Sequence, residues 1–201
     1  MLIPGEWGDK RKMRIGLLGG SFNPPHEGHL HLSLLAKNKL SLDQVWWLVT
    51  PQNPLKKSFP ATPIQERVRN AKALPLPAWL HLTELESTYG TVFTFEILRK
   101  INIRFPNAKF VWLMGADNLV QLSSWMNWSE IFNSVRIAVF DRETYKYKSI
   151  FGKAATKFRS KRVSSSRALT LWHNRLPSWV FFSSRKNNLS STKVRLLKAK
   201  L

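Results

Sequence analysis

A short apolar run that leads into two glycines and two prolines is the feature that most restricts how this chain can fold. Ile15–Leu18 is typical of a buried strand, and Gly19 and Gly20 follow it at once. Glycine has no Cβ, so the backbone N–H groups of such a turn can approach an anion closely. Pro24 and Pro25 stop the strand, and proline is well tolerated at the first position of a helix. The sequence therefore predicts a strand, a turn open to an anion, and a helix.

The helix that follows opens with two histidines. His26 and His29 are three residues apart, which places them on neighbouring positions of one helix face. The positive end of the helix dipole, the free amides of the first turn and the two imidazoles would then meet at one spot. Gly20, Ser21 and Phe22 form the turn beside it. We predict a phosphate-binding site here, and the alternative is a histidine pair with a purely structural role.

Other kinds of glycine-turn site are excluded by what this turn lacks. It has no Gly-x-Gly-x-x-Gly pattern, which dinucleotide-binding turns carry, and no Lys-Ser or Lys-Thr pair, which ends a P-loop. Leu30 stands where the helix of a zinc protease would need its second histidine. The chain also has no cysteine and no other histidine cluster at ligand spacing, so we expect no metal site made by the protein.

The chain length and the spacing of apolar runs suit one α/β domain. Its 201 residues can bury a proper core. Short apolar runs alternate with helical patterns, which is typical of a Rossmann-like open parallel sheet with helices on both faces. We interpret residues 1–13 as an N-terminal extension and 14–201 as the domain, with Trp46 and Trp47 in its core. No apolar run approaches the about 18 residues of a membrane span. With no signal-peptide pattern and no cysteine, we expect a cytoplasmic protein without a membrane partner.

The formal net charge of +20 allows three explanations. A basic surface attracts nucleic acid, and it can also concentrate ATP and other phosphorylated substrates. Because the basic residues are not confined to one motif, we favour the third, an ordinary solvated basic surface with no nucleic-acid partner. Residues 145–175 are basic and serine-rich, and we interpret them as a mobile, solvated connection with one possible helix, Ile150–Phe158. A dedicated polyanion site is the alternative for this segment.

Loops that follow predicted strands carry further candidates, because ligands of open α/β sheets bind at the carboxyl ends of the strands. Lys56 follows the second predicted strand and is either a phosphate-binding residue or an ordinary solvated lysine. Asp117 follows the fourth and could accept hydrogen bonds from ribose hydroxyls or cap the next helix. Thr62 could cap a helix that begins at Pro63. The predicted strands are Arg14–Gly19, Val45–Thr50, Ala78–Thr83, Ala108–Met114, Arg136–Asp141 and Trp179–Phe182, and the first predicted helix is Glu27–Leu40.

Two motifs at opposite ends of the chain resemble those of the nucleotidylyltransferase superfamily. Residues 20–29 are similar to its Gly-x-Phe-Asp-Pro-x-His-x-Gly-His signature. Ser190–Arg195 is similar to its second signature, Ile-Ser-Ser-Thr-x-Ile-Arg, with Leu189 in place of the first isoleucine. Two separated motifs in the right order are much more specific than either alone. Within the superfamily the chain most resembles the nicotinate-nucleotide adenylyltransferase family, and the resemblance covers nearly the whole chain from about Arg14 onward.

Three segments carry the resemblance to that family. Residues 115–128 keep its Gly-Ala-Asp and its Leu-x-x-Trp-x-x-Trp spacing, and residues 51–56 resemble its Pro-x-x-Asn-Pro-x-Lys loop. Residues 89–98 match its Tyr-Thr-x-Asp-Thr-Leu segment only in part. The resemblance implies that the mononucleotide is bound by Thr94, Asp117, Trp125, which would stack on the nicotinate ring, and Arg142, which stands without the family's following Pro-Gly.

The resemblance also implies a reaction, in which AMP passes from ATP to nicotinate mononucleotide and pyrophosphate leaves. Catalysis would consist of positioning and charge neutralisation, with Mg²⁺ held mostly by ATP and water. His26, His29 and Arg195 would be catalytic, and ATP would bind to Gly20, Ser21, Phe22, Lys56, Ser191 and Thr192. The alternatives are a sister enzyme that uses nicotinamide mononucleotide or phosphopantetheine and, in another class, a non-enzymatic RNA-binding protein. A homo-oligomer is also possible.

Overall fold

The structure is a computed structural model that describes residues 10–50, 62–141 and 146–183. In this part of the chain, seven strands form one sheet in the order β3-β2-β1-β4-β5-β7-β6. All neighbouring strands pair in parallel. The first strand, β1, lies inside the sheet; β2 and β3 follow on one side of it, and β4, β5, β7 and β6 lie on the other side. The predicted Rossmann-like open parallel sheet is confirmed.

The six predicted strands all occur, with ends within two residues of the predicted ones. The predicted first helix, Glu27–Leu40, has the observed bounds. The strands are β1 (Arg14–Gly20), β2 (Gln44–Val49), β3 (Leu80–Thr83), β4 (Lys109–Gly115), β5 (Arg136–Phe140), β6 (Arg162–Val163) and β7 (Trp179–Phe182). The helices are α1 (Glu27–Leu40), α2 (Ile64–Lys72), α3 (Leu85–Thr88), α4 (Thr94–Arg104), α5 (Ala116–Gln121), η1 (Leu122–Ser124), α6 (Trp128–Ser134), α7 (Lys146–Ile150), α8 (Lys153–Lys157), η2 (Arg159–Lys161) and η3 (Ser165–Trp172).

The core consists of two apolar clusters, one on each face of the sheet. Successive residues of a strand point to opposite faces, so the adjacent Trp46 and Trp47 enter different clusters. Both are buried, and each indole N–H donates a hydrogen bond, Trp46 to Gln44 Oε1 and Trp47 to Ser33 Oγ. The prediction that these tryptophans pack in the core is confirmed.

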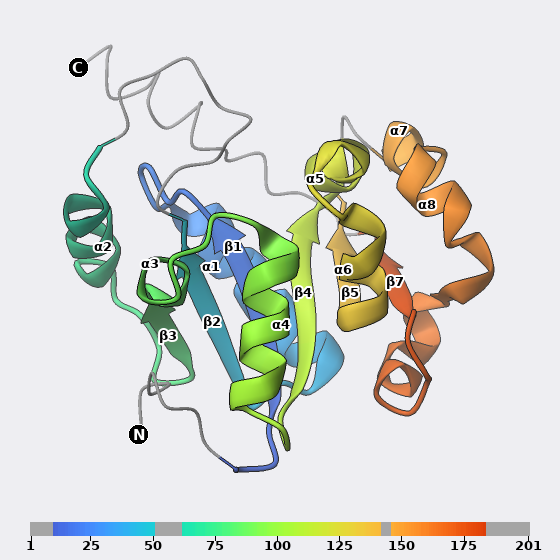
Figure 1. Ribbon diagram of the computed structural model, residues 1–201, viewed down its shortest axis with the longest axis horizontal. Coiled ribbons are helices and arrows are strands. Elements are labelled where there is room, and N and C mark those ends of the chain that lie inside the picture. The colour runs from blue at the N-terminus through green and yellow to red at the C-terminus, as the bar shows by residue number, and fades with distance from the viewer. Residues whose placement is uncertain (1–9, 51–61, 142–145, 184–201) are drawn as a thin grey trace.

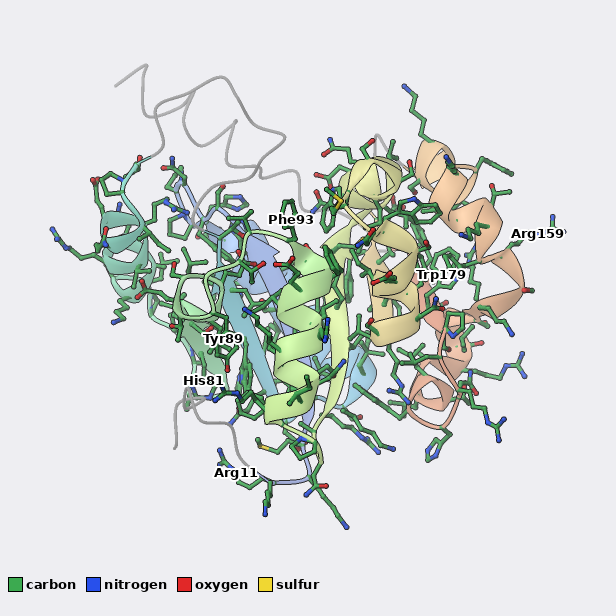
Figure 2. The ribbon with its side chains drawn as sticks, in the orientation of Figure 1. Arg11, His81, Tyr89, Phe93, Arg159 and Trp179 are labelled. Carbon is green, nitrogen blue, oxygen red and sulfur yellow. The ribbon has the colours of Figure 1, made fainter. Side chains whose placement is uncertain are left out.

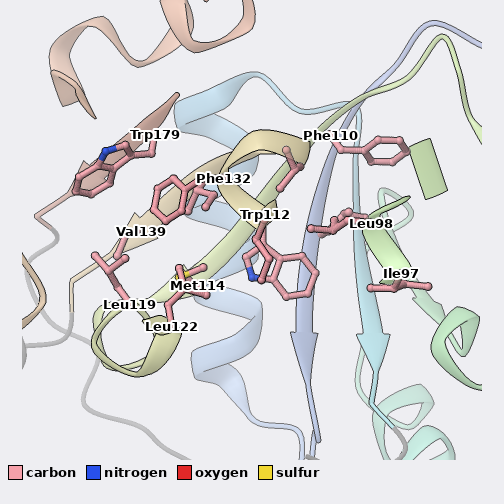
Figure 3. Packing of buried hydrophobic residues seen from close by; sticks show 14 of the residues in the cluster. Ile97, Leu98, Phe110, Trp112, Met114, Leu119, Leu122, Phe132, Val139 and Trp179 are labelled. Carbon is pink, nitrogen blue, oxygen red and sulfur yellow. The ribbon is translucent and has the colours of Figure 1, made fainter. Parts of the chain in front are cut away.

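Helices cover both faces of the sheet. Figure 1 shows α4 in front of the strands and α1 behind them. The front cluster includes side chains of α4, α5 and α6, and the rear cluster includes side chains of α1, α2 and η3. Figure 3 shows the front cluster where Trp112 and Met114 of β4 lie beside Phe132 of α6. Parallel strands are buried on both faces, which explains why β2 is buried along its whole length and apolar from Val45 to Val49.

The described residues of 145–175 contain more regular structure than the one possible helix that the sequence indicated. They form α7, α8, η2, β6 and η3, and β6 extends the sheet by pairing with β7. The predicted helix Ile150–Phe158 is two helices, because Gly152 has extended backbone angles and caps the second. The segment is anchored by aromatic contacts: Phe158 stacks on Phe132 with ring centroids 4.1 Å apart, and the Trp179 indole donates to Phe158 O.

The helices of the described residues include none that is both long and apolar enough to cross a bilayer.

Candidate active site

The turn between β1 and α1 brings the two predicted histidines together. His26 is the N-cap of α1, and its Nδ1 accepts the Gly28 N–H at 3.1 Å. In return, His29 Nδ1 accepts the His26 N–H at 3.3 Å. Two backbone donors that a helix start leaves without intrahelical partners are thereby satisfied. The imidazole centroids lie 3.9 Å apart, so the prediction that they share one face of the helix is confirmed.

These hydrogen bonds decide where each imidazole carries its proton. A neutral imidazole accepts through one nitrogen and donates through the other. Because Nδ1 accepts in both His26 and His29, the proton of each neutral ring belongs on Nε2. Both rings are therefore Nε2–H donors at the positive end of a helix dipole, an arrangement suited to phosphate oxygens.

Phe22 has an unusual backbone in this turn. Its φ is +45°, in the left-handed region that bulky residues rarely adopt, and such a conformation costs about 1–3 kcal/mol. The cost is offset by burial of the ring, which stacks on Trp47 with centroids 4.7 Å apart and lies 4.8 Å from the His29 ring. Because the side chain belongs to the core, Phe22 can meet a ligand through its backbone only.

Gly19 and Gly20 are the last two residues of β1, and a Cβ added to either would meet an aromatic ring. A Cβ on Gly19 would lie 2.6 Å from the Trp112 indole of the neighbouring strand, so packing against that ring requires glycine here. A Cβ on Gly20 would come within 3.3 Å of the Phe22 ring, a tight contact. This packing is a reason for glycine at 19 that the sequence did not indicate, and the approach of an anion to Gly19 and Gly20 stays a prediction.

Arg67 of α2 is a site residue that sequence reasoning missed. Its Nη1 donates to Ser21 O at 2.6 Å and to Thr50 O at 2.8 Å, and its Nε donates to Thr62 O at 2.9 Å. The predicted Thr62 cap is wrong, since Pro63 is the N-cap of α2 and no side chain caps it. A signal was present in the sequence, because position 67 lies on the apolar face that α2 buries.

A buried carboxyl group accompanies this arginine. Glu86 of α3 is 4% exposed, and burial raises its pKa to about 7, against the opposing effects of a Thr50 hydrogen bond and the Arg67 charge. Burial lowers the pKa of Arg67, and the Glu86 charge opposes that shift. The two groups and Thr50 form a polar network under the carboxyl ends of β1 and β2.

Two predicted mononucleotide-binding residues, Asp117 and Thr94, lie at the starts of helices at the carboxyl edge of the sheet, and a third, Trp125, follows η1. Asp117 is in the first turn of α5, directly after β4, and β4 pairs with β1. The capping alternative is wrong, because Gly115 is the N-cap. Thr94 is the first residue of α4; Figure 2 shows the preceding Phe93 at the end of that helix toward which β4 runs. Trp125 follows η1 and is half-buried against the front cluster.

The other predicted site residues lie outside the described residues. They are Lys56, Arg142, Ser191, Thr192 and Arg195. Within 10–50, 62–141 and 146–183, no three His, Asp or Glu side chains gather in a group that could hold a metal ion.

Comparisons with known proteins agree with this geometry. Residues 17–197 match the model of the cytidylyltransferase-like family. A protein of Rhizobium johnstonii named probable nicotinate-nucleotide adenylyltransferase is 39% identical over 92% of this chain and 94% of its own length. One of the same name from Methylorubrum extorquens strain PA1 is 43% identical over 91% of this chain and 99% of its own length.

Solved structures share the fold. Nicotinic acid mononucleotide adenylyltransferase of Plasmodium falciparum, complexed with APC, superposes with a TM-score of 0.67 at 17% identity, covering 92% of this chain and 83% of that chain. The same enzyme complexed with NaAD gives the same values. The fold and the histidine turn thus define a nucleotidyltransferase of the cytidylyltransferase-like family. Within that family the chain belongs to the nicotinate-nucleotide adenylyltransferases.

Proposed function

We propose that this protein transfers AMP from ATP to nicotinate mononucleotide, which yields nicotinate adenine dinucleotide and pyrophosphate for NAD biosynthesis. The observation that carries the proposal is the pair His26 and His29, whose Nδ1 atoms both accept backbone N–H groups at the start of α1. Family membership supports it, because relatives that cover nearly the whole chain are named for this activity.

The chemistry asks the protein for charge neutralisation and alignment. A phosphate oxygen of the mononucleotide attacks the α-phosphorus of ATP, and the bond to the bridging oxygen of pyrophosphate breaks. The attacking phosphate monoester has a second pKa near 6, so it is largely a dianion at neutral pH and needs no general base. What remains is to hold two anions together, and Nε2–H donors and helix amides serve that purpose.

The triphosphate would be shared between two ends of the domain. His26, His29 and the backbone of Gly20, Ser21 and Phe22 would bind it at the turn described above. Lys56, Ser191 and Thr192 would hold its other phosphates, and the planar fork of Arg195 would neutralise the leaving pyrophosphate; these four residues lie outside the described part of the chain.

The acceptor would lie along the same sheet edge. Asp117 would accept hydrogen bonds from ribose hydroxyls, and the flat face of Trp125 would stack on the nicotinate ring. Thr94 begins α4, whose N-terminal amides suit a carboxylate. Arg142, outside the described residues, completes the proposed set.

Magnesium would arrive with ATP. Mg²⁺ prefers phosphate and water oxygens and keeps several waters. We therefore propose that its ligands are the phosphate oxygens of ATP and water molecules.

The acceptor that the protein prefers distinguishes the proposed reaction from those of the sister enzymes. Purified protein is incubated with Mg–ATP and nicotinate mononucleotide, nicotinamide mononucleotide or phosphopantetheine, and pyrophosphate release is measured. We expect the highest kcat/KM with the nicotinate compound. A higher value with either other acceptor would overturn the assigned substrate, and release with none of the three would overturn the proposed function.

A further inference from the structure

Arg67 joins three separate segments at the carboxyl edge of the sheet. Its side chain is 2% exposed, although arginine is rarely buried unless paired. The guanidinium donates to the carbonyl oxygen of Ser21 after β1, to that of Thr50 after β2, and to that of Thr62 before α2. All three acceptors are backbone carbonyls of residues outside the strands, although the Thr50 N–H still donates to Gly20 O at 3.0 Å and so continues the pairing of β2 with β1.

The bond to Ser21 has a directional consequence. A trans peptide unit is planar, with its C=O and N–H pointing in opposite directions. Because Arg67 Nη1 holds Ser21 O at 2.6 Å, the N–H of Phe22 is aimed away from Arg67. Phe22 follows with its positive φ, and its ring is fixed against Trp47. The peptide plane between Ser21 and Phe22 is thereby held from both sides.

Arginine suits this task better than lysine. Its planar fork presents several N–H donors in fixed directions, whereas a lysine ammonium is a single point at the end of a flexible stem. Here one nitrogen bridges the ends of two neighbouring strands, and a second nitrogen reaches Thr62. Thr50 contacts both Arg67 and Glu86, because its carbonyl accepts from Arg67 and its side chain hydrogen-bonds Glu86.

We propose that Arg67 is a positioning residue for ATP, which fixes the Ser21–Phe22 peptide so that the Phe22 N–H is presented to a phosphate oxygen. The inference rests on the proposed function, since it assumes that the triphosphate binds at this turn. Arg67 itself touches carbonyl oxygens of the protein and acts through them.

The chain offers a matched control for replacing this arginine. Arg136, at the amino end of β5, also donates to three carbonyl oxygens, those of Leu171, Trp172 and Asn174. Burial lowers its pKa as it does that of Arg67. It stands at the opposite edge of the parallel sheet from the proposed site. Arg136→Lys therefore removes a similar guanidinium clamp without changing the turn.

The test compares Arg67→Lys, Arg136→Lys and the unchanged protein by calorimetric binding of a non-hydrolysable ATP analogue and, separately, of nicotinate mononucleotide. We expect Arg67→Lys to raise the Kd of the analogue at least about 10-fold and that of the mononucleotide less than about 3-fold. Arg136→Lys should change neither by more than about 3-fold. Equal weakening of both ligands by Arg67→Lys, or no weakening of the analogue, would overturn the proposal.

A second measurement does not depend on any variant being folded. In the unchanged protein, the amide resonance of Phe22 should shift on addition of the ATP analogue and become protected from hydrogen exchange. An unperturbed Phe22 amide at saturation would overturn the inference. Analogue binding needs no acceptor and no turnover, so a protein that binds the analogue through Phe22 but releases no pyrophosphate would refute the proposed function and leave this inference standing.

Discussion

His29 has two separable roles at the residue scale. Its Nδ1 caps α1 by accepting the His26 N–H, and its Nε2–H is proposed to bind phosphate. Glutamine at the third helical position also accepts from the N-cap N–H, so it can keep the first role without the imidazole. His29→Ala and His29→Gln therefore separate helix capping from catalysis.

We expect His29→Ala to lower the unfolding free energy by about 1 kcal/mol, because the cap of α1 is lost. We expect it to lower kcat by a factor of about 10²–10³, because the donor to phosphate is lost. His29→Gln should recover most of the stability and little of the activity. Urea unfolding and pyrophosphate release measure the two effects. Full activity in either variant would remove His29 from the proposed machinery.

The sequence predicted the histidines because both signals are local. The spacing of His26 and His29 and the prolines before them determine the face and the start of α1. The requirement for glycine at 19 comes instead from Trp112, a side chain on another strand. The apolar face of α2 indicates that Arg67 is buried, but it does not indicate which distant loops supply its carbonyl partners. Contacts across the fold have no local pattern.

At the element scale, the burial of Glu86 in α3 makes the stability of the folded protein depend on pH. Its pKa of about 7 in the folded protein stands above its ordinary value of 4.5. The folded state thus binds the proton more tightly than the unfolded state, and stability falls as pH rises from about 4.5 to about 7. The raised pKa of Glu86 corresponds to a loss of at most roughly 3 kcal/mol of unfolding free energy over this pH range.

Glu86→Gln removes the ionisable group and should flatten this slope. We expect the variant to gain stability relative to the unchanged protein as the pH is raised from about 5 to about 8. Urea unfolding at a series of pH values measures it. A parallel pH dependence in the two proteins would show that another group carries the slope.

The strands were predicted to within two residues because short apolar runs bounded by turns identify parallel strands from sequence alone. The elements between 146 and 175 were not, since they are short and lack periodicity. These elements are held in place by contacts with residues far away in the sequence. Phe158 stacks on Phe132, and the Trp172 indole donates to Leu40 O.

Two phenylalanines in this segment test its packing. Phe158 is buried, whereas Phe151 is 76% exposed. We expect Phe158→Ala to lower the unfolding free energy by about 3 kcal/mol or more, since a cavity forms beside Phe132. Phe151→Ala should change it by less than about 0.5 kcal/mol. Equal unfolding midpoints for the two variants would favour the solvated connection that the sequence indicated.

At the scale of the whole molecule, parallel topology gathers the site from distant positions. The strand order places the ends of β2, β1 and β4 side by side. The turn with His26, the network of Arg67 and Asp117 after β4 therefore meet one edge, although about 90 residues separate the first from the last. That the site lies at this edge was predictable from the alternation of strands and helices. That Arg67 and Glu86 are buried beside its loops was not predictable in this way.

The net charge of +20 leads to the last prediction. Between 146 and 183 the basic residues are not balanced by any Asp or Glu, and many of their side chains are exposed. A field of one sign attracts multiply charged ligands and is screened over about 8–10 Å at physiological ionic strength.

The Kd of the ATP analogue should thus rise several-fold when salt is increased from about 50 to about 500 mM, whereas that of uncharged adenosine should stay nearly constant. Calorimetric titrations of both ligands across this range make the comparison. An equal salt response of both ligands would mean that the basic residues do not help to attract the nucleotide, and would leave only their role as a solvated surface.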